Sequence, residues 1–161
     1  NLLGPHTNPC RAKRQVLGVY NKELVTTFAS VAKKLSMEHA LIVHGFDGLD
    51  EITITDSTYV AELKNKEIIE YEISPKDFGL SLAKISEVTA QSPEDSLLLV
   101  REAFAGEKSA VQDMIALNAG AALYLAGKAD SISDGVELSF TLMNNGMAAD
   151  KLAAYVRISN S

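Results

Sequence analysis

The sequence predicts an α/β fold in which a mixed, mainly parallel sheet is followed by a packed helical tail. Two observations carry this prediction. First, an apolar strand-like run, an amphipathic helical segment and a second apolar run follow one another within about thirty residues, which is typical of a βαβ unit with parallel strands and a right-handed crossover. Second, only helical periodicity remains after Ser92. The 161 residues, 47% of them hydrophobic, can form one domain with an aliphatic core.

The first part of the chain is expected to form the sheet. Residues 1–14 contain Gly4, Pro5 and Pro9, which favour a loop with defined turns. The helix of the βαβ unit is expected over residues 22–35, because its apolar positions recur at steps of three and four after Asn21, a suitable N-cap. Strands are expected at residues 15–20, 39–43, 51–55, 59–63 and 67–73, the last two as a hairpin. A turn over residues 74–79 and a connecting segment over residues 80–92 follow.

Four helices are expected after this segment. Ser92 as N-cap, Pro93 at the first helical position and acidic residues in the first turn mark the start of the first helix. Glycine-containing breaks then separate the helical segments. The expected helices cover residues 93–105, 109–126, 131–144 and 147–158.

The charge balance and the single cysteine argue against several classes of protein. Fifteen Lys and Arg against 21 Asp and Glu give a formal net charge of −6, which disfavours a general binder of nucleic acid or of anionic membranes. No apolar run approaches the ~20 residues of a membrane span, and no signal peptide is visible. Cys10 alone forms no intrachain disulfide, which fits a reducing, cytoplasmic setting.

The candidate functional site is the segment of residues 44–51, where an apolar strand runs into two glycines and three carboxylates, Asp47, Asp50 and Glu51. In open α/β sheets, ligands bind outside the carboxyl ends of the strands. Adjacent carboxylates at that position can hold a divalent ion, and Mg²⁺ usually takes one or two of them together with phosphate oxygens. Asp and Gly are also common turn residues. The spacing alone therefore leaves a metal site and a solvated turn as alternatives.

Other polar residues are better explained by structural roles. His44, at the end of the expected strand, is interpreted as a hydrogen-bonded structural imidazole. The basic cluster of Arg11, Lys13 and Arg14 fits a solvated loop better than a phosphate site. Asp113 and Asn118 are expected to make hydrogen bonds between helices, and catalysis by Cys10 is disfavoured.

Several segments together resemble anthranilate phosphoribosyltransferase. Residues 1–9, N-L-L-G-P-H-T-N-P, resemble that family's F-N-x-L-G-P-L-T-N-P segment, and residues 14–20 its R-Q-x-x-G-V-Y strand. The V-H-G of residues 43–45 and the D-G-L-D-E of residues 47–51 match a loop of the family. Further matches at residues 60–63, 77–79, 117–124 and 126–129 follow in the same order over nearly the whole chain.

The resemblance implies a phosphoribosyltransferase fold, similar to that of class II nucleoside phosphorylases. It also implies transfer of phosphoribose from 5-phosphoribosyl pyrophosphate (PRPP) to anthranilate in tryptophan biosynthesis. Asp50 and Glu51 match the family's Mg²⁺-binding acid pair, and Gly4 matches a glycine beside the anthranilate site. His6 replaces the family's usual leucine there.

The family's G-T-G-G-D phosphate loop, its K-H-G-N segment and its anthranilate-binding arginine have no counterpart in the sequence. We therefore interpret residues 1–161 as the carboxyl-terminal α/β domain of a longer, cytoplasmic enzyme that forms a homodimer through amino-terminal helices. Alone, this domain is expected to be inactive and to expose an apolar patch.

Three alternatives stay open on the sequence: an enzyme similar to class II nucleoside phosphorylases, a non-catalytic homologue that binds nucleic acid or a partner, and an enzyme split over two chains.

Overall fold

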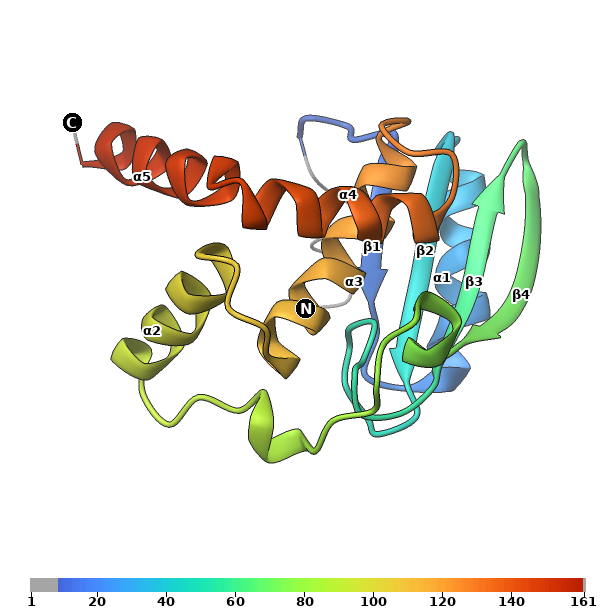
Figure 1. Ribbon diagram of the computed structural model, residues 1–161. Helices are drawn as coiled ribbons and strands as arrows, with labels where there is room; N and C mark the ends of the chain where they lie inside the picture. The colour runs from blue at the N-terminus through green and yellow to red at the C-terminus, as the bar shows by residue number, and fades with distance from the viewer. Residues whose placement is uncertain (1–8, 161) are drawn as a thin grey trace.

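The computed structural model describes residues 9–160 and contains a four-stranded sheet with helices on both of its faces (Figure 1). The strands are β1 (Arg14–Gly18), β2 (His39–Gly45), β3 (Thr58–Lys64) and β4 (Glu67–Ile73). Helix α1 (Lys22–Lys34) connects β1 to β2. After β4 come two short 3-10 helices, η2 (Pro75–Phe78) and η3 (Ile85–Glu87), and then helices α2 (Pro93–Phe104), α3 (Ala110–Leu125), α4 (Ile132–Asn144) and α5 (Met147–Ser159). The mixed α/β class and the helical tail are confirmed.

The strand order is β1-β2-β3-β4. Strands β1 and β2 are parallel, as the βαβ unit requires, whereas β2 and β3 are antiparallel, and so are β3 and β4. Among the described strands the sheet is therefore less parallel than expected, with one parallel pairing of three. The reason is local: a loop, and no helix, joins β2 to β3, so that β3 returns antiparallel beside β2.

Alternation along β2 divides the core into two parts. All seven residues of β2 are buried. Ala40 and Ile42 pack in the cluster formed with α1, whereas Leu41 and Val43 pack in the cluster formed with α3 and α4. Because successive side chains of a strand point to opposite faces, a strand covered on both sides is apolar at every position. This explains the uninterrupted run that precedes the candidate site.

Helices α1 to α4 begin where their polar caps predict. Asn21, Ser92, Ser109 and Ser131 each accept a hydrogen bond from a backbone N–H of the first turn of α1, α2, α3 and α4, respectively. One pair of glycines allows α3 and α4 to pack closely, because Gly120 of α3 and Gly135 of α4 touch through their backbones. A Cβ on Gly135 would lie 2.2 Å from the Gly120 carbonyl oxygen. Within residues 9–160, no helix has the length and apolar character that a membrane crossing requires.

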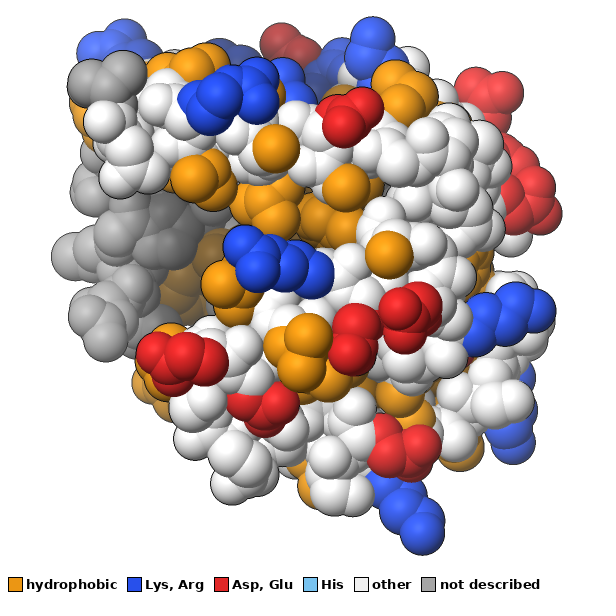
Figure 2. Space-filling view, turned by 60° about the vertical axis from the view of Figure 1, so that its left-hand side comes forward, with side chains coloured by type: hydrophobic (Ala, Val, Ile, Leu, Met, Phe, Trp, Pro, Cys, Tyr) orange, Lys and Arg blue, Asp and Glu red, His pale blue; other side chains and the backbone are white. Residues whose placement is uncertain are grey.

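Helices α2 and α5 leave an apolar groove exposed. No residue of α5 is buried, and the helix extends away from the sheet (Figure 1). Hydrophobic side chains gather on the face formed by these two helices (Figure 2). The groove measures about 420 Å³ and is lined by Leu97, Arg101, Phe104, Ala149, Leu152, Ala153, Val156 and Arg157. The expected exposed apolar patch is therefore present.

One expected strand does not form. Residues 51–55 show the alternation of a strand, but they lie in the loop between β2 and β3. Ile52 and Ile54 are buried in the core cluster beside α3, and Thr53 between them is buried as well. The buried side chains therefore anchor a loop to the core, and the segment does not pair with a neighbouring strand.

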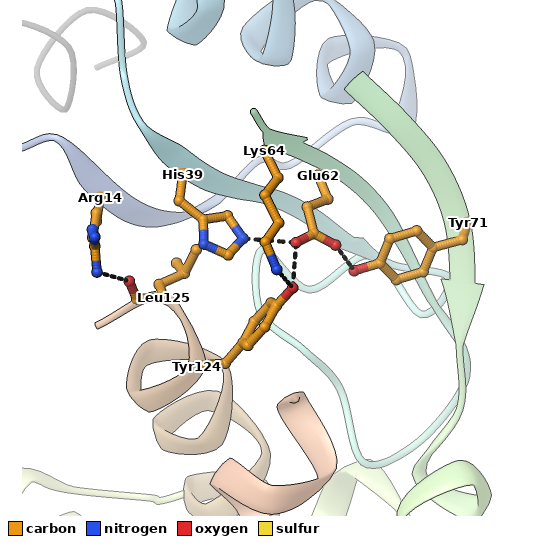
Figure 3. A network of polar contacts seen from close by, with 7 residues as sticks. All are labelled: Arg14, His39, Glu62, Lys64, Tyr71, Tyr124 and Leu125. Atoms are coloured by element: carbon orange, nitrogen blue, oxygen red, sulfur yellow. Dashed lines mark hydrogen bonds and ion pairs between the residues drawn. The ribbon is translucent and has the colours of Figure 1, made fainter. Parts of the chain in front are cut away.

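A polar network ties α3 to the sheet at the amino-terminal end of β2 (Figure 3). His39 Nε2 lies 2.6 Å from Glu62 Oε1, and the hydroxyls of Tyr124 and Tyr71 donate to the same carboxylate at 2.8 and 2.9 Å. Lys64 donates to the Tyr124 hydroxyl. The Glu62 side chain is only 13% exposed, so these partners replace the water that its charge would otherwise need.

This network predicts acid sensitivity. Burial raises the pKa of Glu62, but hydrogen bonds from His39, Tyr124 and Tyr71 outweigh burial and lower the pKa below its ordinary value of 4.5. A lowered folded-state pKa stabilises the fold above the unfolded value and loses that contribution as the pH falls through the folded value. Urea denaturation between about pH 6 and pH 3 should show a loss of unfolding free energy that is smaller in Glu62→Gln. The exposed Glu67→Gln is the control, and an equal pH dependence in all three proteins would contradict this role.

Candidate metal-binding loop

The candidate site lies in the loop of residues 46–57, which leaves the carboxyl end of β2 and leads into β3. Its first turn is closed by backbone hydrogen bonds from Gly45 N to Leu49 O and from Gly48 N to Gly45 O. Gly48 has φ +95°, a conformation that glycine adopts without a steric penalty. The end of a buried strand thus places the acidic residues outside the sheet edge, as the sequence predicts.

Asp47 holds the loop together. Its carboxylate accepts hydrogen bonds from the Thr53 hydroxyl at 2.5 Å, from the Thr55 hydroxyl and from the backbone N–H of Leu49. Burial raises the pKa of Asp47, but these hydrogen bonds outweigh burial and lower it. Asp47 is therefore an ionised structural acceptor, and its oxygens are occupied by the loop itself.

Two distant residues fix the backbone around Asp50 and Glu51. Gly18, at the end of β1, packs directly against the loop: a Cβ at this position would lie 1.6 Å from the Asp50 carbonyl oxygen. From α3, Asn118 Oδ1 accepts from Ile52 N at 3.0 Å, and Asn118 Nδ2 donates to Ile52 O at 2.9 Å. The backbone is thus held at Asp50 and directly after Glu51.

Asp50 and Glu51 differ from Asp47 because their carboxylates accept no hydrogen bond from residues 9–160. Partial burial, and then the charge of Asp50, raise the pKa of Glu51. Two adjacent carboxylates with unoccupied oxygens and mutual repulsion form an arrangement that a divalent cation stabilises. Glu51 also borders a pocket of about 220 Å³ lined by Val88, Val111, Met114, Ile115 and Asn118.

The two carboxylates of Asp50 and Glu51 are suitable ligands for Mg²⁺ if other ligands complete its coordination shell. Within residues 9–160, no group of three or more His, Cys, Asp and Glu side chains is placed to hold a metal. Mg²⁺ does not need such a cage, because it commonly binds one or two carboxylates and completes its shell with water and phosphate oxygens. The loop therefore suits an ion shared with a phosphate-bearing ligand.

The other residues singled out in the sequence have varied positions. Gly4 and His6 lie outside the described residues. His44 is buried, and its Nδ1 lies 2.7 Å from the Val19 carbonyl oxygen, which confirms its structural role. Arg14 contacts Glu38 and the Leu125 carbonyl, so the basic cluster is partly engaged in the fold. Cys10 is exposed.

Sequence reasoning missed two contributions to this site. Asn118 was expected to join two helices, but it clamps the candidate loop through Ile52 instead. The contact of Gly18 with the loop was not predicted from the sequence. Two sequence features could have pointed to these residues: Asn118 is a polar amide in a mostly apolar helix, and Gly18 is a glycine at the end of a strand. Neither feature identifies the residue that is contacted.

The Asn118 clamp yields a testable expectation. In Asn118→Leu, the N–H and C=O of Ile52 lose their partners in a largely buried place, which should lower the unfolding free energy by about 2 to 3 kcal/mol. Urea denaturation measures this loss, and amide hydrogen exchange at Ile52 reports the local loosening. Asn160→Leu, near the end of α5, is the control and should change stability by less than about 0.5 kcal/mol. Full stability of Asn118→Leu, with a protected Ile52 amide, would show that the clamp is unimportant.

Comparisons with known proteins identify the family of this chain. Residues 1–149 match the model of the glycosyl transferase family, a/b domain. Anthranilate phosphoribosyltransferase from Alkalilimnicola ehrlichii is 49% identical over 157 residues, which cover 98% of this chain and 46% of that protein. The corresponding protein from Halorhodospira halophila is 47% identical over 156 residues, covering 97% of this chain and 46% of that protein. The chain thus spans about half the length of the curated relatives that it matches.

Solved structures lead to the same group of proteins. The crystal structure of anthranilate phosphoribosyltransferase from Thermus thermophilus has a TM-score of 0.90 and 34% identity, covering 99% of this chain and 47% of that chain. The enzyme from Saccharomyces cerevisiae, in complex with PRPP and Mg, has a TM-score of 0.75 and 25% identity, covering 86% of this chain and 40% of that chain. These matches confirm the resemblance drawn from the motifs and do not favour a nucleoside phosphorylase. The chain belongs to the glycosyl transferase family, a/b domain, and is similar over its length to anthranilate phosphoribosyltransferases.

Proposed function

We propose that this chain is the carboxyl-terminal part of a Mg²⁺-dependent enzyme that transfers phosphoribose from PRPP to anthranilate. The observation that carries the proposal is the pair Asp50 and Glu51, whose carboxylates accept no hydrogen bond from the described residues and stand on a loop held by Gly18 and Asn118. The relatives named above and the yeast complex with PRPP and Mg support the choice of reaction.

In this proposal the two carboxylates hold the ion, and the rest of the loop holds the carboxylates. When bound, Mg²⁺ neutralises the negative charge that builds up on the departing pyrophosphate. Asp47, Asn118 and Gly18 keep the loop in place before substrate arrives, so that little reorganisation is needed at the moment of reaction. Gly4 would lie beside the anthranilate, where the lack of a side chain permits close approach.

The proposal extends to the complete protein. The phosphates of PRPP need backbone N–H groups of a phosphate-binding loop, and no G-T-G-G-D motif occurs in these 161 residues. We therefore propose that the chain alone has no appreciable turnover, and that the complete enzyme works in the cytoplasm as a homodimer.

The test compares two proteins in one assay. The complete protein and the purified 161-residue chain are each given PRPP, anthranilate and Mg²⁺, and the loss of anthranilate fluorescence is followed. Turnover by the complete protein, abolished by EDTA and restored by Mg²⁺, is the expected result, with none by the chain alone. Phosphorolysis of pyrimidine nucleosides is measured in parallel, because that activity without use of anthranilate would favour the nucleoside phosphorylase alternative. Robust turnover by the isolated chain would contradict the proposal that its active site is incomplete.

The non-catalytic alternative has its own measurement. A protein that binds nucleic acid through its phosphates shows affinity that falls steeply with salt. With a net charge of −6, the chain is expected to show no such binding in a salt-dependent DNA titration.

A further inference from the structure

A second pocket lies on the other flank of α3, away from the metal-binding loop. It measures about 680 Å³, within the usual range for small-molecule sites. Its lining residues come from the segment after η2, the α2–α3 junction, α3 and α4: Leu80, Ala105, Gly106, Lys108, Ser109, Gln112, Asp113, Phe140 and Asn144. None of them borders the pocket beside Glu51. The function proposed above makes no use of it.

Gln112 lines this pocket and has one side-chain polar atom without a partner among the described residues. The side chain is 2% exposed, and its Nε2 donates to the Ala103 carbonyl at 3.2 Å and to Asn144 Oδ1 at 3.3 Å. The Ala103 carbonyl can only accept, so it fixes which end of the amide faces it. Gln112 Oε1 accepts no hydrogen bond from residues 9–160. A buried acceptor in this state favours a ligand that brings an N–H or O–H group.

The charged groups of the pocket are of both signs. Asp113 is half-buried, and its carboxylate forms no ion pair or hydrogen bond with the described residues. Lys108 is exposed and forms no ion pair with the described residues either. The two groups interact electrostatically, but they do not form a salt bridge with each other. Each is available to a ligand group of opposite charge, at neighbouring positions.

The other lining residues of the pocket provide hydrogen-bond donors and apolar surface. Ser109 and Asn144 also line the pocket and each carry a donor, and Ser109 caps α3, whose amino-terminal dipole favours an anion. Leu80 and Phe140 supply apolar surface. A carboxylate therefore fits beside Lys108, a cationic donor fits beside Asp113 and Gln112 Oε1, and an apolar group fits against Leu80 and Phe140.

We propose that this pocket binds a free α-amino acid with an apolar side chain, recognised as a zwitterion by Lys108, Asp113 and Gln112. The amino acid's ammonium group satisfies the buried Gln112 oxygen and faces the Asp113 carboxylate. Its carboxylate group faces Lys108 and the start of α3. The pocket shares helix α3 with the Asn118 clamp, but the proposal concerns binding alone and does not depend on the transferase function.

The test uses L-phenylalanine as probe on the 161-residue chain, with calorimetry and ligand-observed NMR. Two analogues each remove one charge: N-acetyl-L-phenylalanine lacks the ammonium, and L-phenylalaninamide lacks the carboxylate. We expect saturable binding of L-phenylalanine and at least about tenfold weaker binding of either analogue, which corresponds to one lost charged contact.

Two substitutions assign the contacts. Asp113→Asn should abolish the preference for L-phenylalanine over the acetylated analogue, and Lys108→Met should abolish the preference over the amide. The exposed residues Asp130 and Lys128 provide matched controls, Asp130→Asn and Lys128→Met, which should keep both preferences. Circular dichroism confirms that each variant is folded. No binding at millimolar L-phenylalanine would overturn the proposal, and so would equal binding of all three compounds, because the latter shows apolar adsorption only.

Discussion

Asp50→Asn and Glu51→Gln should each lower the Mg²⁺-dependent transferase rate of the complete protein by about 10²- to 10³-fold, the usual cost of removing one group that stabilises transition-state charge. Folding should be almost unaffected, because neither carboxylate accepts a hydrogen bond from residues 9–160. Glu51→Gln also removes a charge that partial burial and then the repulsion from Asp50 disfavour, the two causes that raise the pKa of Glu51, so this variant should be at least as stable as the parent.

Two measurements separate the metal from the fold. The rate of the complete protein is titrated with Mg²⁺, and the variants should need more metal and reach a lower maximum. On the 161-residue chain, Mn²⁺ should broaden the backbone amide signals of residues 47–52 in the parent and not in the variants. Asp56→Asn is the matched control: Asp56 is an exposed carboxylate of the same loop whose Oδ1 accepts from Ser57 N, a bond that Asn can keep. Unchanged rates in both acid variants would remove the metal assignment.

The fold was predictable where the sequence pattern has a single explanation. Helices α1 to α4 follow polar caps, and the hairpin of β3 and β4 turns at Asn65 and Lys66, both with positive φ. The segment of residues 51–55 shows the limit. Alternating apolar residues predict which side chains are buried, but they do not predict whether the backbone pairs with a neighbouring strand. Here the backbone hydrogen bonds of the segment go to Asn118, the Thr58 hydroxyl and the Ala83 N–H, and not to the backbone of a strand.

The candidate site was predictable only as far as it is local. The order of strand, glycines and acids marks residues 47–51 as a candidate site, but its three carboxylates look equivalent by spacing, and only the family resemblance singles out Asp50 and Glu51. The structure separates them, because the oxygens of Asp47 already accept from Thr53, Thr55 and Leu49. The path of the loop determines which threonine hydroxyls donate to which carboxylate. Contacts with β1 and α3 set this path, and the spacing of residues in the sequence does not reveal those contacts.

Gly18→Ala is the substitution with the largest expected effect on the fold and the site together. The added Cβ would lie 1.6 Å from the carbonyl oxygen of Asp50 and 2.4 Å from its carbonyl carbon, and both are backbone atoms that cannot move aside as a flexible side chain does. Either the end of β1 or the loop must shift. We expect a loss of about 3 kcal/mol in unfolding free energy, at the upper end of the usual cost of overpacking.

A second glycine shows whether the effect on the metal loop is specific. Gly120→Ala places a Cβ 2.6 Å from the Val136 backbone nitrogen, so it also forces a backbone to move, but at the crossing of α3 and α4. Both variants should therefore unfold at lower urea concentrations. Only Gly18→Ala should also weaken the Mn²⁺ broadening of residues 47–52, measured at low urea where both proteins are folded. Equal broadening in the two variants would mean that the loop holds its acid pair without β1, and that Gly18 serves the packing of the sheet alone.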